Sequence, residues 1–376
     1  MIQSLFHGGS GFLESVLAFL LLITPVVFFH ELGHFSIARL FGVKVETFSI
    51  GFGPAIASWV DRKGTLWKLS WFPLGGYVKF LGDLDAASTP DREKIDNMSA
   101  EERAGAFPFK PLYQRALIVA AGPVANFILA IAIFTGFLLI FGGMLERPVI
   151  NQVVHGSVAE ASGFKVGDLI TQVDDRDVDS FDDVAAMIQM RPKVPMNFVV
   201  QRRGATIVIH ATPKLVVFKD RLGEMETIGQ LGFVVVAGKP VTYGPIGALK
   251  EACHQTWSIL RTTWDFRMQL MSGTPGAVSQ LHGPLGIATI AGKVASISFL
   301  SLIKLAALIS VSIGLVNLFP IPMLDGGHLL YYGCEAVLGR PLGARAQELG
   351  FRLGLAVILG LMVLATWNDL VRLNLF

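Results

Sequence analysis

Four stretches of the chain are long and apolar enough to cross a bilayer, and most of the charge lies between them. The first runs from about residue 11 to 41 and holds no charged residue from Val16 to Phe29. The second spans 116–141, also without charge, the third spans about 298–324, and the shortest runs from Leu353 to Trp367. Because a spanning helix needs about 20 mostly apolar residues, we expect four transmembrane helices.

Composition supports a membrane setting. Of 376 residues, 52% are hydrophobic and 16% are charged, whereas soluble domains carry about 25% charged residues. One alternative for the first stretch is a cleaved signal peptide, but it lacks the basic segment and small-residue cleavage site of one, so we expect a retained helix. The net charge is +2 without any Lys/Arg-rich block, so we expect no nucleic-acid partner. Cys253 and Cys334 lack metal-site spacing, and we expect packing roles for both.

The distribution of basic residues predicts the orientation. Residues 1–38 contain no Lys or Arg, whereas the connection 42–115 and the connection between the third and fourth stretches are both basic. Cytoplasmic loops are enriched in Lys and Arg. In a bacterial inner (cytoplasmic) membrane, the N-terminus, residues 142–297 and the C-terminus are then expected on the periplasmic side.

The first apolar stretch ends in the pattern His30-Glu31-Leu32-Gly33-His34. On a helix the two histidines, at i and i+4, face one side and can share a metal ion, with Glu31 as the base for water. An isolated pattern of this kind also occurs by chance. At the end of a lipid-buried helix, however, such residues are costly and by default mark function. The sequence therefore predicts a zinc hydrolase site within the membrane.

A catalytic zinc keeps three protein ligands, so a third ligand is expected elsewhere in the chain. The candidate is Asp325, which closes the third apolar stretch as His30 and Glu31 close the first. Because both helices are expected to run inward, both motifs reach the cytoplasmic end of the membrane. Taken alone, Asp325 has the alternative of a membrane-boundary carboxylate. His328 is either a fourth ligand or an interfacial polar group.

The segment before Asp325 contains Pro320 and Pro322, which lack backbone donors and break a helix. We expect the break to loosen the backbone where Asn317 is placed to hydrogen-bond an incoming peptide. The alternative for Asn317 is a hydrogen bond between helices. The pair Gly326-Gly327 allows close approach around the metal.

Residues 148–236 have the pattern of a small α+β domain. A strand is expected over Val149–Val154, a helix over Phe181–Met190 with Ser180 as its cap, and a hairpin around Arg203-Gly204. This order resembles a bacterial PDZ domain, which binds an extended peptide and holds its terminal carboxylate on loop amides. The expected carboxylate loop is Leu231, Gly232 and Phe233. The alternative is a glycine turn without a ligand.

Two further segments are expected at membrane surfaces. Residues 43–82 are rich in glycine and aromatic residues, and we expect strands there with aromatics at the headgroup level. The alternative is an ordinary cytosolic hairpin. Residues 237–297 contain Trp257 and Trp264 among scattered charges, which suggests an amphipathic helix on the outer surface.

The predicted fold is a polytopic α-helical membrane protein with four transmembrane helices and one inserted α+β PDZ-like domain. The expected boundaries are 1–42 for transmembrane helix 1, 43–110 for a cytoplasmic membrane-associated β and loop region, 111–143 for transmembrane helix 2, 144–236 for the PDZ-like domain, 237–297 for an amphipathic surface region, 298–333 for transmembrane helix 3 and 347–374 for transmembrane helix 4.

With these motifs the chain resembles the site-2 protease family of intramembrane zinc metalloproteases, and within it the bacterial regulator-of-sigma-E branch. The resemblance covers nearly the whole length. It implies one zinc ion bound by His30, His34 and Asp325, with Glu31 as the catalytic base. It also implies that the 67–80 segment pairs with substrate as an added strand. The implied substrate-binding residues are Asn317, Pro320, Pro322, Gly75, Gly76, Tyr77 and Val78.

The resemblance further implies the partners. The substrates are expected to be single-pass membrane proteins already trimmed by a first protease, such as anti-sigma factors, together with signal-peptide remnants. Peptide C-termini are expected at the PDZ-like domain, and the lipid bilayer surrounds the helices. Related proteins often carry two tandem PDZ domains, whereas this chain has room for one. The alternative class is a membrane-anchored PDZ scaffold with a non-catalytic metal site. A transporter would favour internal repeats, and we find no duplicated half.

Overall fold

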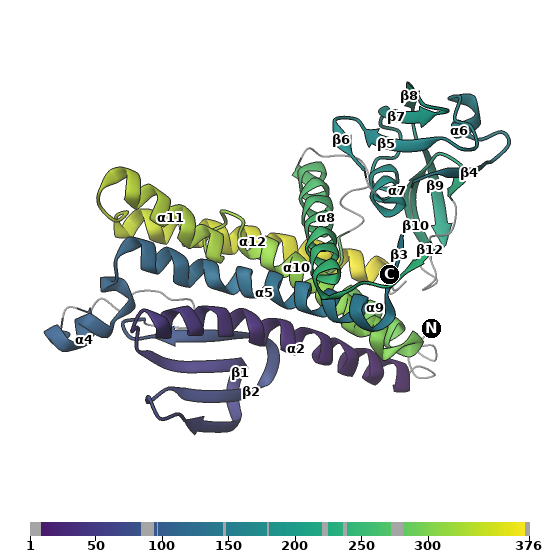
Figure 1. The fold of residues 1–376 in the computed structure, drawn as a ribbon. Helices are drawn as coiled ribbons and strands as arrows, with labels where there is room; N and C mark the ends of the chain where they lie inside the picture. The colour runs from purple at the N-terminus through teal and green to yellow at the C-terminus, as the bar shows by residue number, and fades with distance from the viewer. Residues whose placement is uncertain are drawn as a thin grey trace. The chain divides into compact units, whose positions relative to one another are not determined.

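The computed structural model describes residues 9–83, 94–95, 97–145, 148–178, 180–219, 225–235, 239–271 and 281–372. The chain forms two compact units. The first unit comprises residues 1–133 and 281–376, and the second comprises residues 134–280. Helices dominate the first unit, and most of the strands belong to the second (Figure 1).

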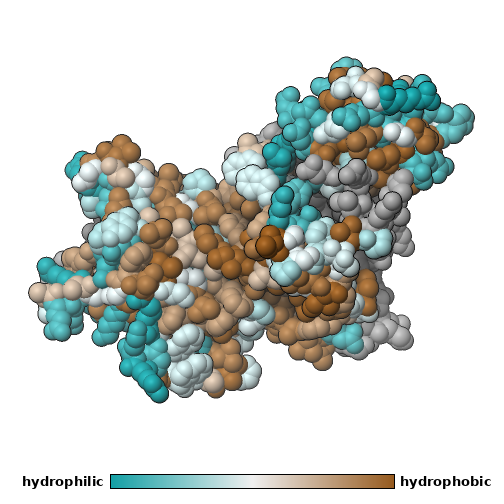
Figure 2. Space-filling model, in the orientation of Figure 1, coloured by the Kyte–Doolittle hydropathy of each residue, from teal (hydrophilic) through white to brown (hydrophobic). Residues whose placement is uncertain are grey.

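Among the described residues, four helices are long and apolar enough to cross a membrane. They are α2 (Gly9–Leu40), α5 (Leu112–Phe141), α10 (Phe299–Asn317) and α12 (Ala344–Arg372). Each coincides with one of the predicted apolar stretches, and α12 is longer at both ends than the predicted Leu353–Trp367 core. Hydrophobic residues cover much of these helices on the face shown in Figure 2. The chain therefore has the helical architecture expected of a membrane protein.

The helix over the third predicted range, 298–333, is interrupted. Helix α10 ends at Asn317, and α11 (Asp325–Leu338) begins after a turn that contains both prolines, as their missing backbone donors predict. Gly326 and Gly327 are buried at the start of α11. A Cβ atom on Gly326 would lie 2.2 Å from the Phe319 carbonyl oxygen, so glycine is needed where the turn folds back onto α11.

The predicted surface region 237–297 divides into two helices. Helix α8 (Pro245–Met271) belongs to the second unit, whereas α9 (Pro284–Ile297) is a short apolar helix of the first unit. Asp369 of α12 accepts hydrogen bonds from the Gly283 and Gly286 amides at 3.0 and 2.8 Å and so caps α9. Four residues of α2, α9 and α10 form a buried apolar cluster: Ala18, Leu22, Ala291 and Leu302.

Strands β1 (Val45–Val60) and β2 (Leu66–Phe80) form a bent hairpin that follows α2. Residues 48–50 have partners on both sides, at 76–78 and at 67–69, and residues 57–60 pair with 66–69. The sheet therefore has four segments in the order 76–80, 45–50, 66–70 and 55–60. Its bends contain Gly51, Gly53 and Gly75, all with positive φ. Segment 76–80 is an edge of this sheet.

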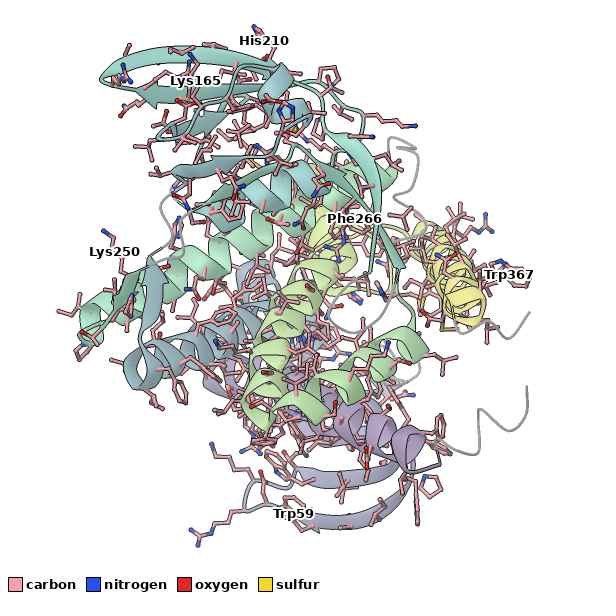
Figure 3. All side chains as sticks on the ribbon, turned by 90° about the vertical axis from the view of Figure 1, so that its right-hand side faces the viewer. Trp59, Lys165, His210, Lys250, Phe266 and Trp367 are labelled. Carbon is pink, nitrogen blue, oxygen red and sulfur yellow. The ribbon has the colours of Figure 1, made fainter. Side chains whose placement is uncertain are left out.

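The hairpin has a buried part and an exposed part. Phe48 is fully buried, with Val45, Val78 and Phe80, in a cluster that includes Ala38 of α2. The far part of the sheet, where Figure 3 labels Trp59, exposes large apolar side chains to the surroundings. These exposed residues are Phe52, Ile56, Trp59, Val60, Leu69, Trp71 and Phe72. Helices α4 (Ala100–Gly105) and η1 (Phe107–Phe109) connect this region to α5.

The second unit contains a four-stranded antiparallel sheet in the order β6 (Arg176–Asp177), β5 (Leu169–Val173), β7 (Met196–Arg202) and β8 (Ala205–Ala211). Ser180 caps helix α7 (Phe181–Gln189) by accepting a hydrogen bond from the Asp183 amide, as predicted. The predicted hairpin around Arg203-Gly204 is also present. Helix α7 packs its Val184 and Ile188 into the core beneath the sheet. Besides these and α8, the described elements of this unit after α5 are β3 (Gly143–Leu145), β4 (Ile150–Val153), α6 (Val158–Ala161), β9 (Lys214–Lys219), β10 (Met225–Gln230), β11 (Phe233–Val235) and β12 (Lys239–Val241).

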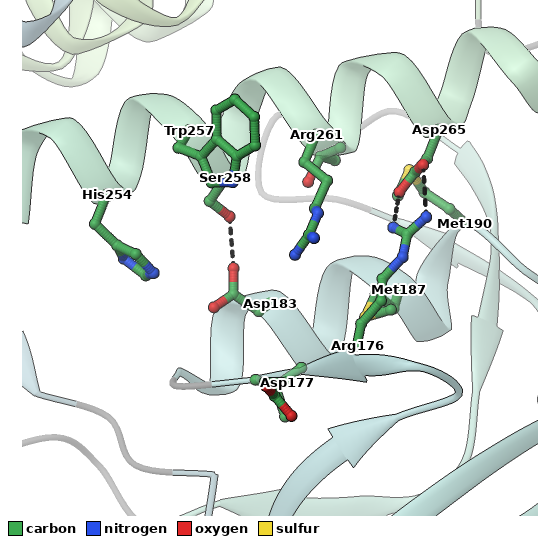
Figure 4. A pocket seen from close by; sticks show the side chains of 12 residues that line it. Arg176, Asp177, Asp183, Met187, Met190, His254, Trp257, Ser258, Arg261 and Asp265 are labelled. Atoms are coloured by element: carbon green, nitrogen blue, oxygen red, sulfur yellow. Dashed lines mark hydrogen bonds and ion pairs between the residues drawn. The ribbon is translucent and has the colours of Figure 1, made fainter.

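Helix α8 is fastened to this small domain within the second unit (Figure 4). Asp265 of α8 forms a two-pronged ion pair with Arg176 of β6. Ser258 of α8 donates a hydrogen bond to Asp183 of α7 at 2.5 Å. The two contacts lie two helical turns apart along α8, so they fix the helix in direction as well as in position.

Candidate metal centre

Three side chains from the two ends of the chain meet in the first unit. His30 and His34 lie one turn apart on α2, and Asp325 is the first residue of α11. The His30 Nε2 atom is 3.2 Å from Asp325 Oδ2 and 3.2 Å from His34 Nε2. The His34 Nε2 atom is 3.5 Å from Asp325 Oδ1. The predicted meeting of Asp325 with the two histidines is therefore present in the structure.

These distances fit a tetrahedral zinc site. Zinc bonds to histidine and carboxylate of about 2.0–2.1 Å separate neighbouring ligand atoms by about 3.3 Å. Asp325 Oδ2 is buried and makes no hydrogen bond, so its lone pairs are available to a cation. One donor atom from each of the three side chains lies within 4.8 Å of the others. Two imidazoles and one carboxylate are a ligand set that catalytic zinc uses, with a fourth position left open.

Each histidine has a second contact that directs its Nε2 atom inward. The His34 Nδ1 atom lies 2.9 Å from the Ile118 carbonyl oxygen of α5. A carbonyl only accepts hydrogen bonds, so Nδ1 carries the proton and Nε2 is free to bind a metal. The His30 Nδ1 atom lies 3.3 Å from the Asn126 side-chain amide, also on α5.

The Asn126 amide is the contact of His30 on α5. Its nitrogen faces His30 Nδ1, and its oxygen is buried without a hydrogen bond. If the amide turned over, its oxygen would accept the Nδ1 proton, and His30 Nε2 would then be free for a metal. In the sequence, only its position as the single Asn inside the uncharged stretch 116–141 marks Asn126.

Two glycines allow α2 and α5 to approach closely at the centre. A Cβ atom on Gly33 would lie 2.3 Å from the Ala121 carbonyl oxygen. A Cβ atom on Gly122 would lie 2.3 Å from His34 Nε2 and 2.9 Å from His30 Cε1. Close contact through small residues is characteristic of packed membrane helices. Gly122 therefore belongs to the centre because it leaves room for both imidazoles.

The three side chains face a cavity that Glu31 also lines. Glu31 packs against the hairpin edge, because a Cβ atom on Gly76 would lie 2.9 Å from its Cγ atom. Met323 lines the cavity with φ at +90°, an uncommon conformation for a residue other than glycine. The complete lining consists of His30, Glu31, His34, Gly76, Tyr77, Val78, Phe80, Phe107, Val119, Asn317, Met323, Leu324, Asp325, His328 and Tyr332.

The predicted substrate-binding residues divide into two groups. Asn317, Gly76, Tyr77 and Val78 line the cavity, and the Asn317 Nδ2 atom lies 3.3 Å from His30 Nε2. Gly75, Pro320 and Pro322 do not line it. Pro322 instead packs on α12, where a Cβ atom on Gly354 would lie 1.9 Å from its carbonyl oxygen.

The predicted carboxylate loop lies in the second unit, between β10 and β11. The Leu231 carbonyl accepts the Ala159 amide at 2.8 Å, and the Gly232 carbonyl accepts the Val154 amide at 2.9 Å. Gly232 has φ at +90°, and a Cβ atom there would lie 2.4 Å from the Ser157 Cβ. The loop is therefore tightly held. The Phe233 ring lies 6.4 Å from the Phe181 ring of α7.

A His-Glu-x-x-His helix, a converging carboxylate and four apolar helices define a class, the membrane-bound metalloproteases. The sequence profile of peptidase family M50 matches residues 18–361. The chain belongs to this family, the site-2 protease family, and is a zinc metalloprotease that uses one zinc ion.

Relatives resemble the chain over nearly its full length. The R01501 protein of Rhizobium meliloti (strain 1021), which carries a zinc metalloprotease name, is 43% identical over 94% of this chain and 95% of its own. The Atu1380 protein of Agrobacterium fabrum, similarly named, is 43% identical over 96% of this chain and 97% of its own. Metalloprotease MmpA of Caulobacter vibrioides is 41% identical over 97% of this chain and 98% of its own.

Proposed function

We propose that this metalloprotease cuts peptide bonds within the membrane, in transmembrane segments of single-pass proteins that another protease has already trimmed. The observation that supports this most is the convergence of His30, His34 and Asp325 beside Glu31, with both histidines inside a membrane-spanning type of helix. Cleavage of a soluble substrate would not require metal-binding side chains on a membrane-spanning helix. A metal centre on such a helix serves substrates that are themselves in the bilayer.

In the proposed mechanism, His30, His34 and Asp325 would hold the zinc ion. A bound zinc would supply the acidity of a water molecule and the polarisation of a peptide carbonyl. Glu31 takes the proton from the attacking water and then passes it to the leaving nitrogen. The Ile118 carbonyl and the Asn126 amide keep the two imidazoles oriented through the reaction.

The hairpin edge supports a mode of substrate binding. A helical substrate hides its carbonyls in i→i−4 hydrogen bonds and must unwind before attack. Segment 76–80 has a strand partner on one side, and its Gly76, Tyr77 and Val78 line the metal cavity. An unwound segment that adds a strand to this edge would have its backbone hydrogen bonds satisfied. Asn317, which also lines the cavity, would then hydrogen-bond the held peptide.

The remaining parts of the proposal concern location and the second unit. The basic connections 42–115 and 339–352 favour a bacterial inner membrane with the active site toward the cytoplasm and the second unit on the periplasmic side. We take residues 144–236 as a single PDZ-like domain that binds peptide C-termini at Leu231, Gly232 and Phe233. Expected substrates are anti-sigma-factor-like proteins and signal-peptide remnants, as in the regulator-of-sigma-E branch of the family.

The test uses the purified full chain in detergent with a single-span substrate, with and without a zinc chelator. Cleavage should require zinc, and Glu31→Gln should retain zinc but abolish cleavage. Glu14→Gln, an exposed carboxylate earlier on the same helix, is the matched control and should cleave normally. Full activity of Glu31→Gln would refute its role as base. A peptide-binding chain without turnover would instead indicate the membrane-anchored scaffold.

The ligand set has a separate test by metal analysis. His30→Phe, His34→Phe and Asp325→Ala should each lower the zinc content of the purified protein. An unchanged zinc content in Asp325→Ala would remove this residue from the ligand set, whatever the activity of the variant.

A further inference from the structure

Helix α11 turns one face toward the metal cavity. Asp325, His328 and Tyr332 follow one another at i, i+3 and i+7, the spacing of a single helix face, and all three line the cavity. Asp325 belongs to the metal group. The other two polar side chains on this face, His328 and Tyr332, have no part in the proposed hydrolysis.

Tyr332 is already engaged at the far end of this face. The Arg115 guanidinium of α5 lies 4.9 Å from the centre of its ring. The same guanidinium binds Glu335 of α11 at 2.5 Å. Arg115 therefore contacts α11 one and two turns beyond His328. One turn before His328, Asp325 contacts His30 and His34. His328 thus lies between two stretches of α11 that other helices hold.

The His328 imidazole is a polar group without a partner. Its backbone amide donates to the Leu324 carbonyl at 3.3 Å, but within the described part of the chain its ring makes no hydrogen bond or ion pair. It also lies outside the group of donor atoms that His30, His34 and Asp325 bring within 4.8 Å of one another. The structure therefore does not support His328 as a fourth ligand. A cavity-facing imidazole beside the centre is available to substrate.

We propose that His328 donates a hydrogen bond to the carbonyl oxygen of the scissile peptide as this oxygen gains negative charge. The inference rests on the proposed function. A neutral imidazole always carries one N–H, and a fixed donor aimed at developing charge in a water-poor site stabilises the transition state more than the substrate. Removing one such donor typically lowers kcat by about 10²–10³-fold.

The other cavity-lining groups are less suited to this task. Tyr332 is bound by Arg115. In the proposed binding mode, Tyr77 belongs to the edge segment 76–80 that pairs with the substrate backbone, and Asn317 holds the peptide. The wall between them is apolar and cannot donate, because it consists of Val78, Phe80, Phe107, Val119, Met323 and Leu324.

The test compares His328→Leu, which removes the donor, with His328→Gln, which keeps an N–H. In the zinc-loaded full chain, His328→Leu should lower kcat on a single-span substrate by about 10²-fold or more while KM stays within about twofold. His328→Gln should recover a substantial part of kcat. Cys334→Ala, on the same helix but outside the cavity lining, is the control and should match wild type.

Two readouts do not depend on turnover. Zinc content should be equal in wild type and both variants. A peptide phosphinate, whose anionic oxygens mimic the charged carbonyl oxygen, should bind His328→Leu about 10²-fold more weakly than wild type, and His328→Gln should bind it more tightly than His328→Leu. Loss of zinc in His328→Leu would overturn the inference by showing that the residue acts through Asp325. Unchanged kcat and phosphinate affinity would also overturn it. If wild type itself shows no zinc-dependent cleavage, the proposed function fails instead.

Discussion

At the scale of single residues, the centre depends on atoms that face away from the metal as much as on those that face it. Asn126 contacts His30 Nδ1 from a helix that supplies no ligand. Replacing Asn126 with Ala should weaken zinc binding by about 10–100-fold, because partners of this kind fix ring orientation and proton position. Competition between the protein and a graded series of chelators measures the affinity.

Ser310→Ala provides the control for Asn126. The Ser310 hydroxyl donates to the Asn126 backbone carbonyl at 2.9 Å, so this variant disturbs the same helix contact but leaves the amide side chain in place. Its zinc affinity should stay near the wild-type value. Equal losses in both variants would show that helix packing, rather than the amide, is responsible.

The ligands were predictable from the sequence and Asn126 was not, for a physical reason. His30 and His34 are one helical turn apart, so local geometry alone brings them together. Asp325 was predictable because two inward helices end at the same depth. Asn126 meets a partner 96 residues away in sequence, and no local spacing reports such a contact. Only its polarity within an apolar span marks it.

At the scale of elements, the separation of α2 and α5 controls the geometry of the centre. Gly122→Ala places a methyl group where the built Cβ atom lies 2.3 Å from His34 Nε2, so the imidazole must move. We expect Gly122→Ala to lose most of its bound zinc. Gly136→Ala, on the same helix with nothing within 4 Å of the built Cβ atom, should keep its zinc. Metal analysis of the two purified variants measures their zinc content. A normal zinc content in Gly122→Ala would contradict the close packing of α2 and α5 at the centre.

A second prediction at this scale concerns the acid sensitivity of the second unit. Burial would raise the pKa of Asp168, but the Arg202 guanidinium and the Lys165 amide outweigh burial and lower it below its usual 3.8. A lowered pKa adds stability at pH values above about 4, and this stability is lost as the pH falls through the lowered value. The second unit of Asp168→Asn should therefore have a lower free energy of unfolding than that of wild type at pH 7. This difference in stability should become smaller toward pH 3.

Hydrogen exchange of the β7 and β8 amides in the full chain measures this stability. The control is Asp177→Asn, an exposed residue of the same sheet that accepts one long hydrogen bond from Gln172 at 3.4 Å. Its effect should be small at both pH values. If the difference in stability between Asp168→Asn and wild type grew in acid, the pKa of Asp168 would be raised in the folded state rather than lowered.

A helix or a helix end was predictable where a single sequence property determines its position. Hydropathy alone located the four long helices, and the two prolines located the break before α11. The bend of the β1–β2 hairpin was not predictable, because it depends on positive φ at Gly51, Gly53 and Gly75 and on a sheet order that no local pattern encodes. Helix α9 was not predicted as a helix of the first unit, for two reasons. Its 14 residues are too few to span a bilayer, and its composition is too apolar for a surface helix.

At the scale of the whole molecule, the candidate centre connects distant parts of one unit and leaves the other unit out. His30 and Asp325 come from opposite ends of the chain, and both belong to the first unit, whereas residues 134–280 are inserted between them as a separate unit. Zinc that binds only the folded site stabilises it by mass action, by about 2.7 kcal/mol at 100 times its dissociation constant. Removing zinc should therefore speed hydrogen exchange around the start of α11 and the end of α2, while exchange in β7 and β8 stays unchanged.

The measurement is hydrogen exchange by mass spectrometry on the full chain before and after chelation, with zinc added back to show reversal. Asp325→Ala should resemble the chelated protein and should not respond to added zinc. Equal loss of protection in both units would contradict the prediction, because it would mean that the metal stabilises the molecule as one cooperative body rather than the first unit alone.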